Sequence, residues 1–219
     1  MSTQTHFCGI DEAGRGPVIG SLFVAGVCAT QSQIQALSQL GVTDSKMLSA
    51  KKRVALYDKI INIVSSYHII EITPAQIDNR VLLQKSLTDL ELDATITIVQ
   101  KVQPDSIIID CPSANKESYK QIFLQKSHFQ GEVTVEFKAD LNHTVVGAAS
   151  ILAKVSRDKS IDELKEKLQI NCGSGYPSDP YTQEFLKTYY DTYPEIFRKS
   201  WESYKTILSQ NTQRRLDGF

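Results

Sequence analysis

Carboxylates at the ends of apolar runs are the residues in this chain whose types and spacing could do chemistry. Asp11 and Glu12 follow the short apolar run 7–10, and Asp110 follows three consecutive isoleucines. Such acids are awkward to bury, because each charge must be paired or bound to a cation. Asp140 stands at the start of a predicted helix and is a fourth candidate, although taken alone it is better explained as a helix N-cap.

These four carboxylates are expected to gather at one place, because the carboxyl ends of strands form the ligand crevice of an open α/β sheet. A cluster of oxygen ligands suits Mg²⁺ or Mn²⁺ rather than zinc, which prefers His and Cys. Two such ions about 4 Å apart can activate a water molecule and stabilise the leaving oxygen of a phosphodiester. The residue types therefore indicate metal-dependent phosphoryl transfer.

A turn with a glycine on each side of one arginine, Gly14-Arg15-Gly16, comes soon after the first two acids. Glycines let the backbone approach a ligand closely, and an arginine can bind a phosphate. The turn alone is equally consistent with a tight connection between strands. Tyr176 lies in a second glycine-rich loop, 173–177, where its ring either packs on that loop or forms a stacking platform for a sugar or base.

Basic residues in two further segments are candidates for phosphate contacts. Lys46 lies in the polar loop 44–46, and Lys154, Arg157 and Lys159 lie on one predicted helix. An ordinary loop and a solvated helix face are the alternative explanations.

The elements that must position these residues alternate along the chain. The first two predicted strands pair across the turn 16–20, and Pro74 opens a short turn before a long helix. The predicted strands are 7–10, 21–29, 67–72, 106–110 and 132–137. The predicted helices are 31–40, 50–66, 82–102, 116–126, 140–168, 181–191 and 201–209. This order predicts a mixed α/β sheet flanked by helices, with a helical C-terminal portion.

Bulk properties restrict the class of protein further. The chain has 219 residues, a net charge of −1 and four widely spaced cysteines, which we expect to be reduced and mostly buried. The first seven residues do not form a signal peptide, and no apolar run would cross a membrane, so we expect a soluble, cytoplasmic monomer. The expected division is a catalytic domain 1–170, a helical portion 171–209 packed on it, and a flexible tail 210–219.

Taken together, the motifs resemble those of type 2 ribonuclease H (ribonuclease HII), in its archaeal single-chain form. The resemblance covers almost the full length and rests on motifs in a fixed order. They are GIDEAGRGPVIG at 9–20, DSK at 44–46, IIID at 107–110, KAD with VVGAASILAKVSRD within 138–158, and GSGYPSDP at 173–180. Met47 stands where many relatives have a second lysine.

The resemblance implies a ribonuclease H-like fold and a metal-dependent endonuclease with Mg²⁺ or Mn²⁺ as cofactor. The implied substrates are RNA–DNA hybrids and single ribonucleotides embedded in duplex DNA, cleaved to leave a 3′-hydroxyl and a 5′-phosphate. Such an enzyme would serve ribonucleotide removal, replication and repair. The implied metal ligands and catalytic residues are Asp11, Glu12, Asp110 and Asp140. The implied substrate contacts are Gly14, Arg15, Gly16 and Tyr176 at the ribose, and Lys46, Lys154 and Arg157 at phosphates.

The C-terminal tail carries a separate candidate motif. Gln213, Leu216 and Phe219 form the pattern Q-x-x-L-x-x-F, which resembles the sliding-clamp-binding peptide of archaeal and eukaryotic replication proteins. Leu216 and Phe219, one helical turn apart, would fill an apolar groove of the clamp. A tail with a chance match to three positions is the alternative.

Two other functions remain open on the residues alone. One is a different phosphoryl-transfer enzyme on the same fold, such as a DNA exonuclease, which would have no use for a 2′-hydroxyl sensor. The other is a non-catalytic nucleic-acid-binding or clamp adaptor protein. Four acids in a phosphate site disfavour a pure binder, because without metal they repel the nucleic-acid backbone.

Overall fold

The computed structural model describes residues 5–42 and 48–216, with side chains as far as Gln210. The described chain divides into two compact units, neither of which is continuous in sequence. The first contains the chain up to Ala13, Phe23–Glu71 and Thr88–Ser156, and the second contains Gly14–Leu22, Ile72–Leu87 and the chain from Arg157 onward. This partition differs from the predicted boundary at residue 170, and the domain division stays a prediction.

A five-stranded sheet forms the centre of the first unit. The strands lie in the order β3-β2-β1-β4-β5, with β1 antiparallel to β2 and parallel to β4, and β4 parallel to β5. The order and the mixed directions confirm the predicted fold class. The bounds are β1 His6–Ala13, β2 Leu22–Thr30, β3 Ser66–Ile72, β4 Ser106–Asp110 and β5 Glu132–Glu136.

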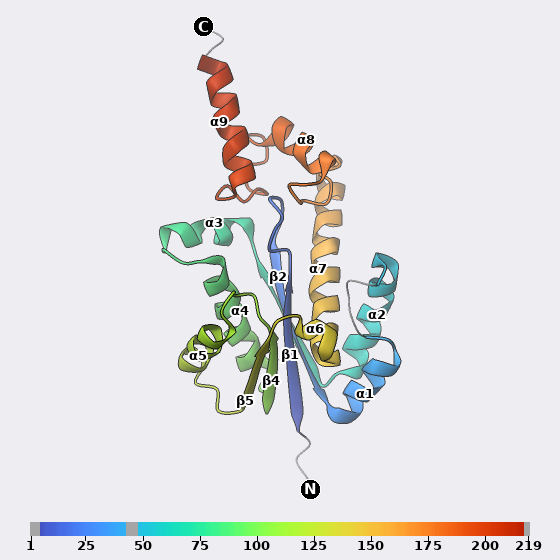
Figure 1. Cartoon of the computed structure of the whole chain (residues 1–219). Helices are drawn as coiled ribbons and strands as arrows, with labels where there is room; N and C mark the ends of the chain where they lie inside the picture. The colour runs from blue at the N-terminus through green and yellow to red at the C-terminus, as the bar shows by residue number, and fades with distance from the viewer. Residues whose placement is uncertain (1–4, 43–47, 217–219) are drawn as a thin grey trace. The chain divides into compact units, whose positions relative to one another are not determined.

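Helices cover both faces of this sheet (Figure 1). Helices α4 and α5 lie on one face, and α1, α2, α6 and the first part of α7 lie on the other. Glycines permit close packing, since a Cβ on Gly9 would meet the backbone of Val145 in α7. The bounds are α1 Gln31–Gln39, α2 Ala50–Ile63, α4 Leu87–Val102, α5 Lys116–Ser127, α6 Ala139–Asn142 and α7 Thr144–Leu168.

The inner strands are buried between these two helical layers. Every residue of β2 is buried, and Ile107 and Ile109 of β4 are each 1 % exposed. Ile108 is half-buried and packs against the cluster that includes the α7 residues. Apolar side chains on both sides of β4 follow from a sheet covered on both faces.

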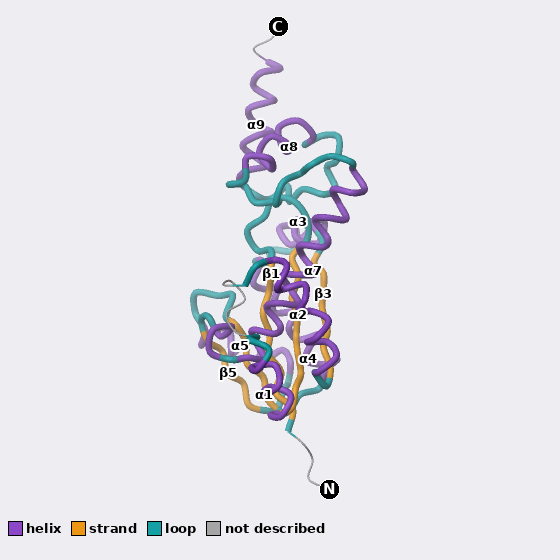
Figure 2. Tube along the Cα trace, turned by 90° about the vertical axis from the view of Figure 1, so that its right-hand side faces the viewer, coloured by secondary structure: helices purple, strands orange, loops and turns teal. Residues whose placement is uncertain are grey.

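The second unit consists of helices joined by long loops (Figure 2). It contains the end of α7, α3 Pro74–Leu82, α8 Pro180–Tyr189 and α9 Glu202–Leu216. Its core is a cluster of Val18, Ile19, Ile161, Cys172, Phe185, Leu186, Phe197 and Tyr204. Ile19 and Phe197 also form an isolated β-bridge, so loop residues from both ends of the chain build this core.

The predicted turn at Pro74 is wrong, because Pro74 begins helix α3. Thr73 caps that helix, its side chain accepting from the Gln76 backbone while the Gln76 side chain accepts from Thr73. Proline at the first helical position and a capping box are start signals that the sequence offered. The long helix α4 consequently begins at Leu87 rather than Leu82, after Gln84 at φ 53°.

The C-terminal helix is longer than predicted, because α9 continues to Leu216 and includes the first residues assigned to the tail. Of the four cysteines, Cys8, Cys28 and Cys172 are buried, and all four are free thiols, as expected. Within the described ranges, none of the helices combines the length and the apolar composition that crossing a bilayer requires.

Candidate active site

The register of two parallel strands brings Asp11 and Asp110 to one edge of the sheet. The pairing of β1 with β4 runs from Phe7 opposite Ser106 to Ile10 opposite Ile109. Asp11 and Asp110 are the next residues on the two strands. Parallel strands end on the same side, so both residues lie at the same edge of the sheet.

Asp140 reaches the same edge from helix α6. The Oδ1 atom of Asp110 accepts a hydrogen bond of 3.0 Å from the backbone N–H of Ala139, the residue before Asp140. Asp140 is 1 % exposed. It is not the N-cap of α6, because that position is taken by Lys138 in a left-handed conformation. The helix-cap explanation of Asp140 is therefore wrong.

Burial and neighbouring charge make Asp11 hard to ionise. Burial is the largest cause and raises its pKa from 3.8 to about 7; the nearby charge of Asp110 raises it as well. A hydrogen bond with Ser150 and the charge of Lys154 act in the opposite direction. Both of those residues lie on α7, where the Lys154 ammonium donates to the Ser150 hydroxyl at 2.9 Å. Asp11 thus has a polar support on the α7 side of the sheet.

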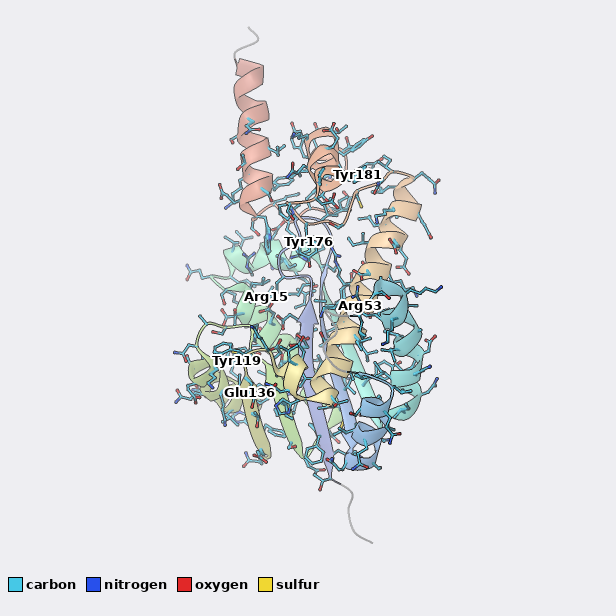
Figure 3. All side chains as sticks on the ribbon, turned by 45° about the vertical axis from the view of Figure 1, so that its right-hand side comes forward. Arg15, Arg53, Tyr119, Glu136, Tyr176 and Tyr181 are labelled. Carbon is cyan, nitrogen blue, oxygen red and sulfur yellow. The ribbon has the colours of Figure 1, made fainter. Side chains whose placement is uncertain are left out.

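Glu12 follows Asp11 on the strand and therefore points to the opposite face. Its backbone N–H donates to Oδ1 of Asp11 at 2.7 Å. Its charge contributes to raising the pKa of Tyr119, a buried residue of α5 (Figure 3), for which burial is the largest cause. Glu12 lies on the α5 side of the sheet, whereas Asp11 lies on the α7 side.

The donor chemistry at this edge fits a hard divalent cation, since all four side chains offer carboxylate oxygens. The raised pKa of Asp11 fits as well, because a bound cation would relieve the repulsion from Asp110. Within the part of the chain that the structure describes, however, no group of three or more His, Cys, Asp or Glu side chains is arranged to hold a metal ion. The backbone places the acids at one edge, and their side chains stand on two faces of β1.

The turn Gly14-Arg15-Gly16 belongs to the second unit. Gly14 has φ 98°, and a Cβ there would lie 3.0 Å from the Ser21 carbonyl oxygen, so the position requires glycine. A Cβ on Gly16 would lie 3.5 Å from a ring carbon of Tyr176, which is ordinary contact. The structure therefore brings Tyr176 against the turn at Gly16.

Arg157 also contacts the Tyr176 ring. Its guanidinium carbon lies 5.0 Å from the centre of the Tyr176 ring. The same guanidinium donates to the Ser174 carbonyl and, at 3.2 Å, to Asp158. Arg157 is 8 % exposed, so it is not part of a solvated helix face. Tyr176 itself is 40 % exposed and keeps ring surface available for a ligand.

Comparison with known proteins shows which family the chain belongs to. The family model for ribonuclease HII matches residues 8–204. The chain belongs to the ribonuclease HII family. It is 44 % identical to the ribonuclease HII of Thermococcus sibiricus over 204 residues, which is 91 % of this chain and 89 % of that protein. Family membership supports ribonuclease H activity, in which hydrolysis depends on a divalent metal ion.

Solved structures of ribonuclease HII relatives are also similar. The crystal structure of ribonuclease H2 from Pyrococcus horikoshii OT3 superposes with a TM-score of 0.87 at 36 % identity, covering 94 % of this chain and 98 % of that one. The ribonuclease HII in the PCNA:RNase HII complex from Archaeoglobus fulgidus gives 0.83 at 34 % identity, covering 92 % and 96 %. These matches confirm the ribonuclease H-like fold.

The remaining candidate residues for substrate and clamp binding stay predictions. Lys46 lies outside the described residues, as does Phe219 at the end of the tail motif. Gln213 and Leu216 are in helix α9. Lys154 is placed beside Ser150 and Asp11, and its phosphate contact is untested.

Sequence reasoning missed three residues that contact Asp11 or the Gly14–Gly16 turn. Ser150 contacts Asp11, and its spacing of four residues from Lys154 on a predicted helix was an available signal. Arg198 and Trp201 contact the backbone of the Gly14–Gly16 turn. No local pattern near the C-terminus indicated that contact.

Proposed function

We propose that this chain is an endoribonuclease that cleaves the RNA strand of RNA–DNA hybrids and cuts 5′ to single ribonucleotides in duplex DNA. The products would carry a 3′-hydroxyl and a 5′-phosphate. The observation that carries the proposal is the β1–β4 register, which supports a carboxylate edge formed by Asp11, Asp110 and Asp140 in a ribonuclease HII chain. The cellular roles would be ribonucleotide removal, DNA replication and repair.

Asp11, Glu12, Asp110 and Asp140 would hold Mg²⁺ or Mn²⁺. Two bound ions would supply an activated water and stabilise the leaving oxygen of the phosphodiester. The chain's own contribution begins with Asp11, since the Ser150 hydrogen bond and the Lys154 charge favour its ionised, metal-binding form.

The Gly14–Gly16 turn and Tyr176 would select the substrate. The 2′-hydroxyl distinguishes RNA from DNA at a given site, so a turn of closely approaching backbone beside an aromatic platform suits a ribose reader. Lys46, Lys154 and Arg157 would contact phosphates, which adds affinity without sequence information. The stacking and hydrogen bonds of Arg157 support a second role for it, which is to orient the Tyr176 ring.

A cleavage assay on matched duplexes tests this function. A duplex with one ribonucleotide, the same duplex in all-DNA form and an RNA–DNA hybrid would be incubated with Mg²⁺, with Mn²⁺ or with EDTA. We expect nicks 5′ to the single ribonucleotide and cuts in the hybrid, only with metal present. The 5′-phosphate would be verified by ligation of the purified downstream fragment.

Each alternative function gives a different result in the same assay. Cleavage of the all-DNA duplex at a similar rate would contradict ribose selection and favour a DNA nuclease. Binding of the duplexes without cleavage in either metal would favour a non-catalytic adaptor.

We also propose that the C-terminal residues Gln213, Leu216 and Phe219 bind a DNA sliding clamp. The relative from Archaeoglobus fulgidus was solved in complex with PCNA, which supports a clamp as the partner. Phe219→Ala in the full chain should lose capture by the cognate clamp while cleavage of the single-ribonucleotide duplex stays unchanged. Arg214→Ala, which alters the same segment outside the motif, is the matched control. Clamp capture that survives Phe219→Ala would refute the proposal.

A further inference from the structure

A buried arginine near the C-terminus has no part in the chemistry described so far. Arg198 is 0 % exposed and lies between helices α8 and α9 along the chain. Its pKa is lowered from 12.5 to about 10, chiefly by burial and then by the nearby Arg157 charge. Burying a cation is costly unless hydrogen bonds compensate, so the contacts of this guanidinium indicate what it stabilises.

The three hydrogen bonds that Arg198 donates reach the segment that contains the Gly14–Gly16 turn. Its Nε donates to the carbonyl oxygen of Gly20 at 2.9 Å, and its Nη1 donates to that of Arg15 at 3.0 Å. Its backbone N–H donates to the Val18 carbonyl at 2.8 Å. One residue therefore fixes three carbonyl groups within six residues of chain.

Trp201 extends this contact to the next carbonyl of the turn. Its indole Nε1 donates to the Gly16 carbonyl oxygen at 3.3 Å. The guanidinium of Arg198 lies 5.0 Å from the centre of the Trp201 ring, and that of Arg80 lies 5.1 Å from it. The indole is thus held by two cations while it donates to the turn.

These bonds determine which way the turn presents its backbone donors. In a trans peptide the N–H points away from the C=O of the same plane, and the described chain has no cis peptide bond. Holding the Arg15 carbonyl therefore directs the Gly16 N–H to the side opposite Arg198. That N–H is one of the few donors that the turn can offer to a ribose.

We propose that Arg198 and Trp201 are positioning residues that hold the Gly14–Gly16 turn in the orientation that selects a ribose. The inference rests on the proposed function, because it assigns to these two residues the geometry of that same ribose reader. Neither residue touches the substrate in this role. Substituting them should therefore change how strongly the protein prefers a ribonucleotide-containing duplex over DNA, and should not change the rate of the chemical step.

The test compares two constants that do not depend on the fraction of active enzyme. KM is measured for a duplex with one ribonucleotide in Mg²⁺, and Ki is measured for the same duplex in all-DNA form as a competitive inhibitor. For the wild type we expect Ki to exceed KM. In Arg198→Lys, which keeps the charge but loses the divergent donors, KM should rise about 10-fold with Ki unchanged.

Two aromatic variants provide a matched pair. Trp201→Phe keeps the ring but removes the donor to Gly16, so KM should rise about 3-fold. Tyr204→Phe removes a hydroxyl that donates to the Tyr190 carbonyl at 3.2 Å in the same unit and not to the turn. It should leave both constants unchanged. Thermal melting of each variant establishes that it folds. If Arg198→Lys does not fold, the result for Trp201→Phe decides the test.

The outcomes separate this inference from the proposed function. If wild-type Ki and KM are equal, ribose reading itself fails and the positioning role falls with it. If the wild type discriminates and Arg15→Ala does not, but folded Arg198→Lys and Trp201→Phe keep the wild-type ratio, only the positioning role is overturned. A parallel rise of KM and Ki would also overturn it, because that pattern indicates a general loss of nucleic-acid binding.

Discussion

The carboxylate edge at Asp11 and the Gly14–Gly16 turn follow one another along the chain, yet they are held in different ways. Asp11 lies in β1, which pairs with β2 as far as Ala13 opposite Phe23 and with β4 as far as Ile10. The Gly14–Gly16 turn is outside the sheet, and its Arg15 and Gly16 carbonyl groups accept single hydrogen bonds from the side chains of Arg198 and Trp201. A strand that loses one backbone hydrogen bond is still held by the others in the ladder, whereas a carbonyl held by one side-chain contact has no replacement when that contact is lost.

This difference has a consequence for mutation. At the carboxylate edge a substitution should change the chemistry and leave the fold intact, because the strands are fixed by bonds that the side chains do not make. In the turn, the loss of one side-chain donor should move the backbone that we propose binds the ribose. The following variants examine that contrast, from the largest expected effect to the smallest.

Asp110→Asn should produce the largest effect. We expect kcat on the single-ribonucleotide duplex to fall at least about 10³-fold, because a charged ligand of the proposed metal site is lost. The fold should persist, since the amide oxygen can still accept from the Ala139 N–H. Glu136→Gln, at the residue paired with Asp110 on β5, is the control and should remain active. A near-native rate in Asp110→Asn would remove Asp110 from the metal site.

Asp11→Asn should stabilise the metal-free protein at alkaline pH. The folded-state pKa of Asp11 is about 7 against an ordinary 3.8, so the folded protein binds more protons between these values. Its stability therefore falls as pH rises through that window and is lowest above it. We expect a gain of a few kcal/mol at about pH 8 and little at about pH 4, since one pKa unit corresponds to about 1.4 kcal/mol.

Urea unfolding in EDTA at several pH values measures this effect of Asp11→Asn. Asp58→Asn, at an exposed position of α2, is the matched control and should not reproduce the gain in stability at alkaline pH. An Asp11→Asn variant that is less stable than the wild type at alkaline pH would show that the ionised carboxylate is not strained there.

Tyr176→Ala should have a smaller effect on catalysis. Loss of the stacking surface should lower kcat/KM on the single-ribonucleotide duplex about 10-fold, since base or sugar stacking contributes about 1–3 kcal/mol. Tyr176→Phe keeps the ring against Arg157 and should retain most of the activity. Tyr181→Ala, an exposed tyrosine on α8, is the control and should match the wild type. Equal losses in both alanine variants would exclude a specific role for Tyr176.

Much of the fold could be predicted from local patterns. The isoleucine run of β4 and the alternation of strands and helices are both present as expected. Helix α3 was missed although Thr73, Pro74 and Gln76 carry its start signals, because proline was interpreted as a turn residue. The length of α9 was missed because its polar C-terminal half has no apolar stripe.

The sequence by itself determined which residues can do chemistry, because acids at strand ends and a glycine–arginine–glycine turn are local features. Only the tertiary structure decided what holds them. It placed Asp11 toward Ser150 and Glu12 toward Tyr119, and it brought Arg198 to the Arg15 carbonyl across 183 residues of chain. A backbone carbonyl can accept a hydrogen bond whatever its side chain, so such a contact leaves no pattern in the sequence.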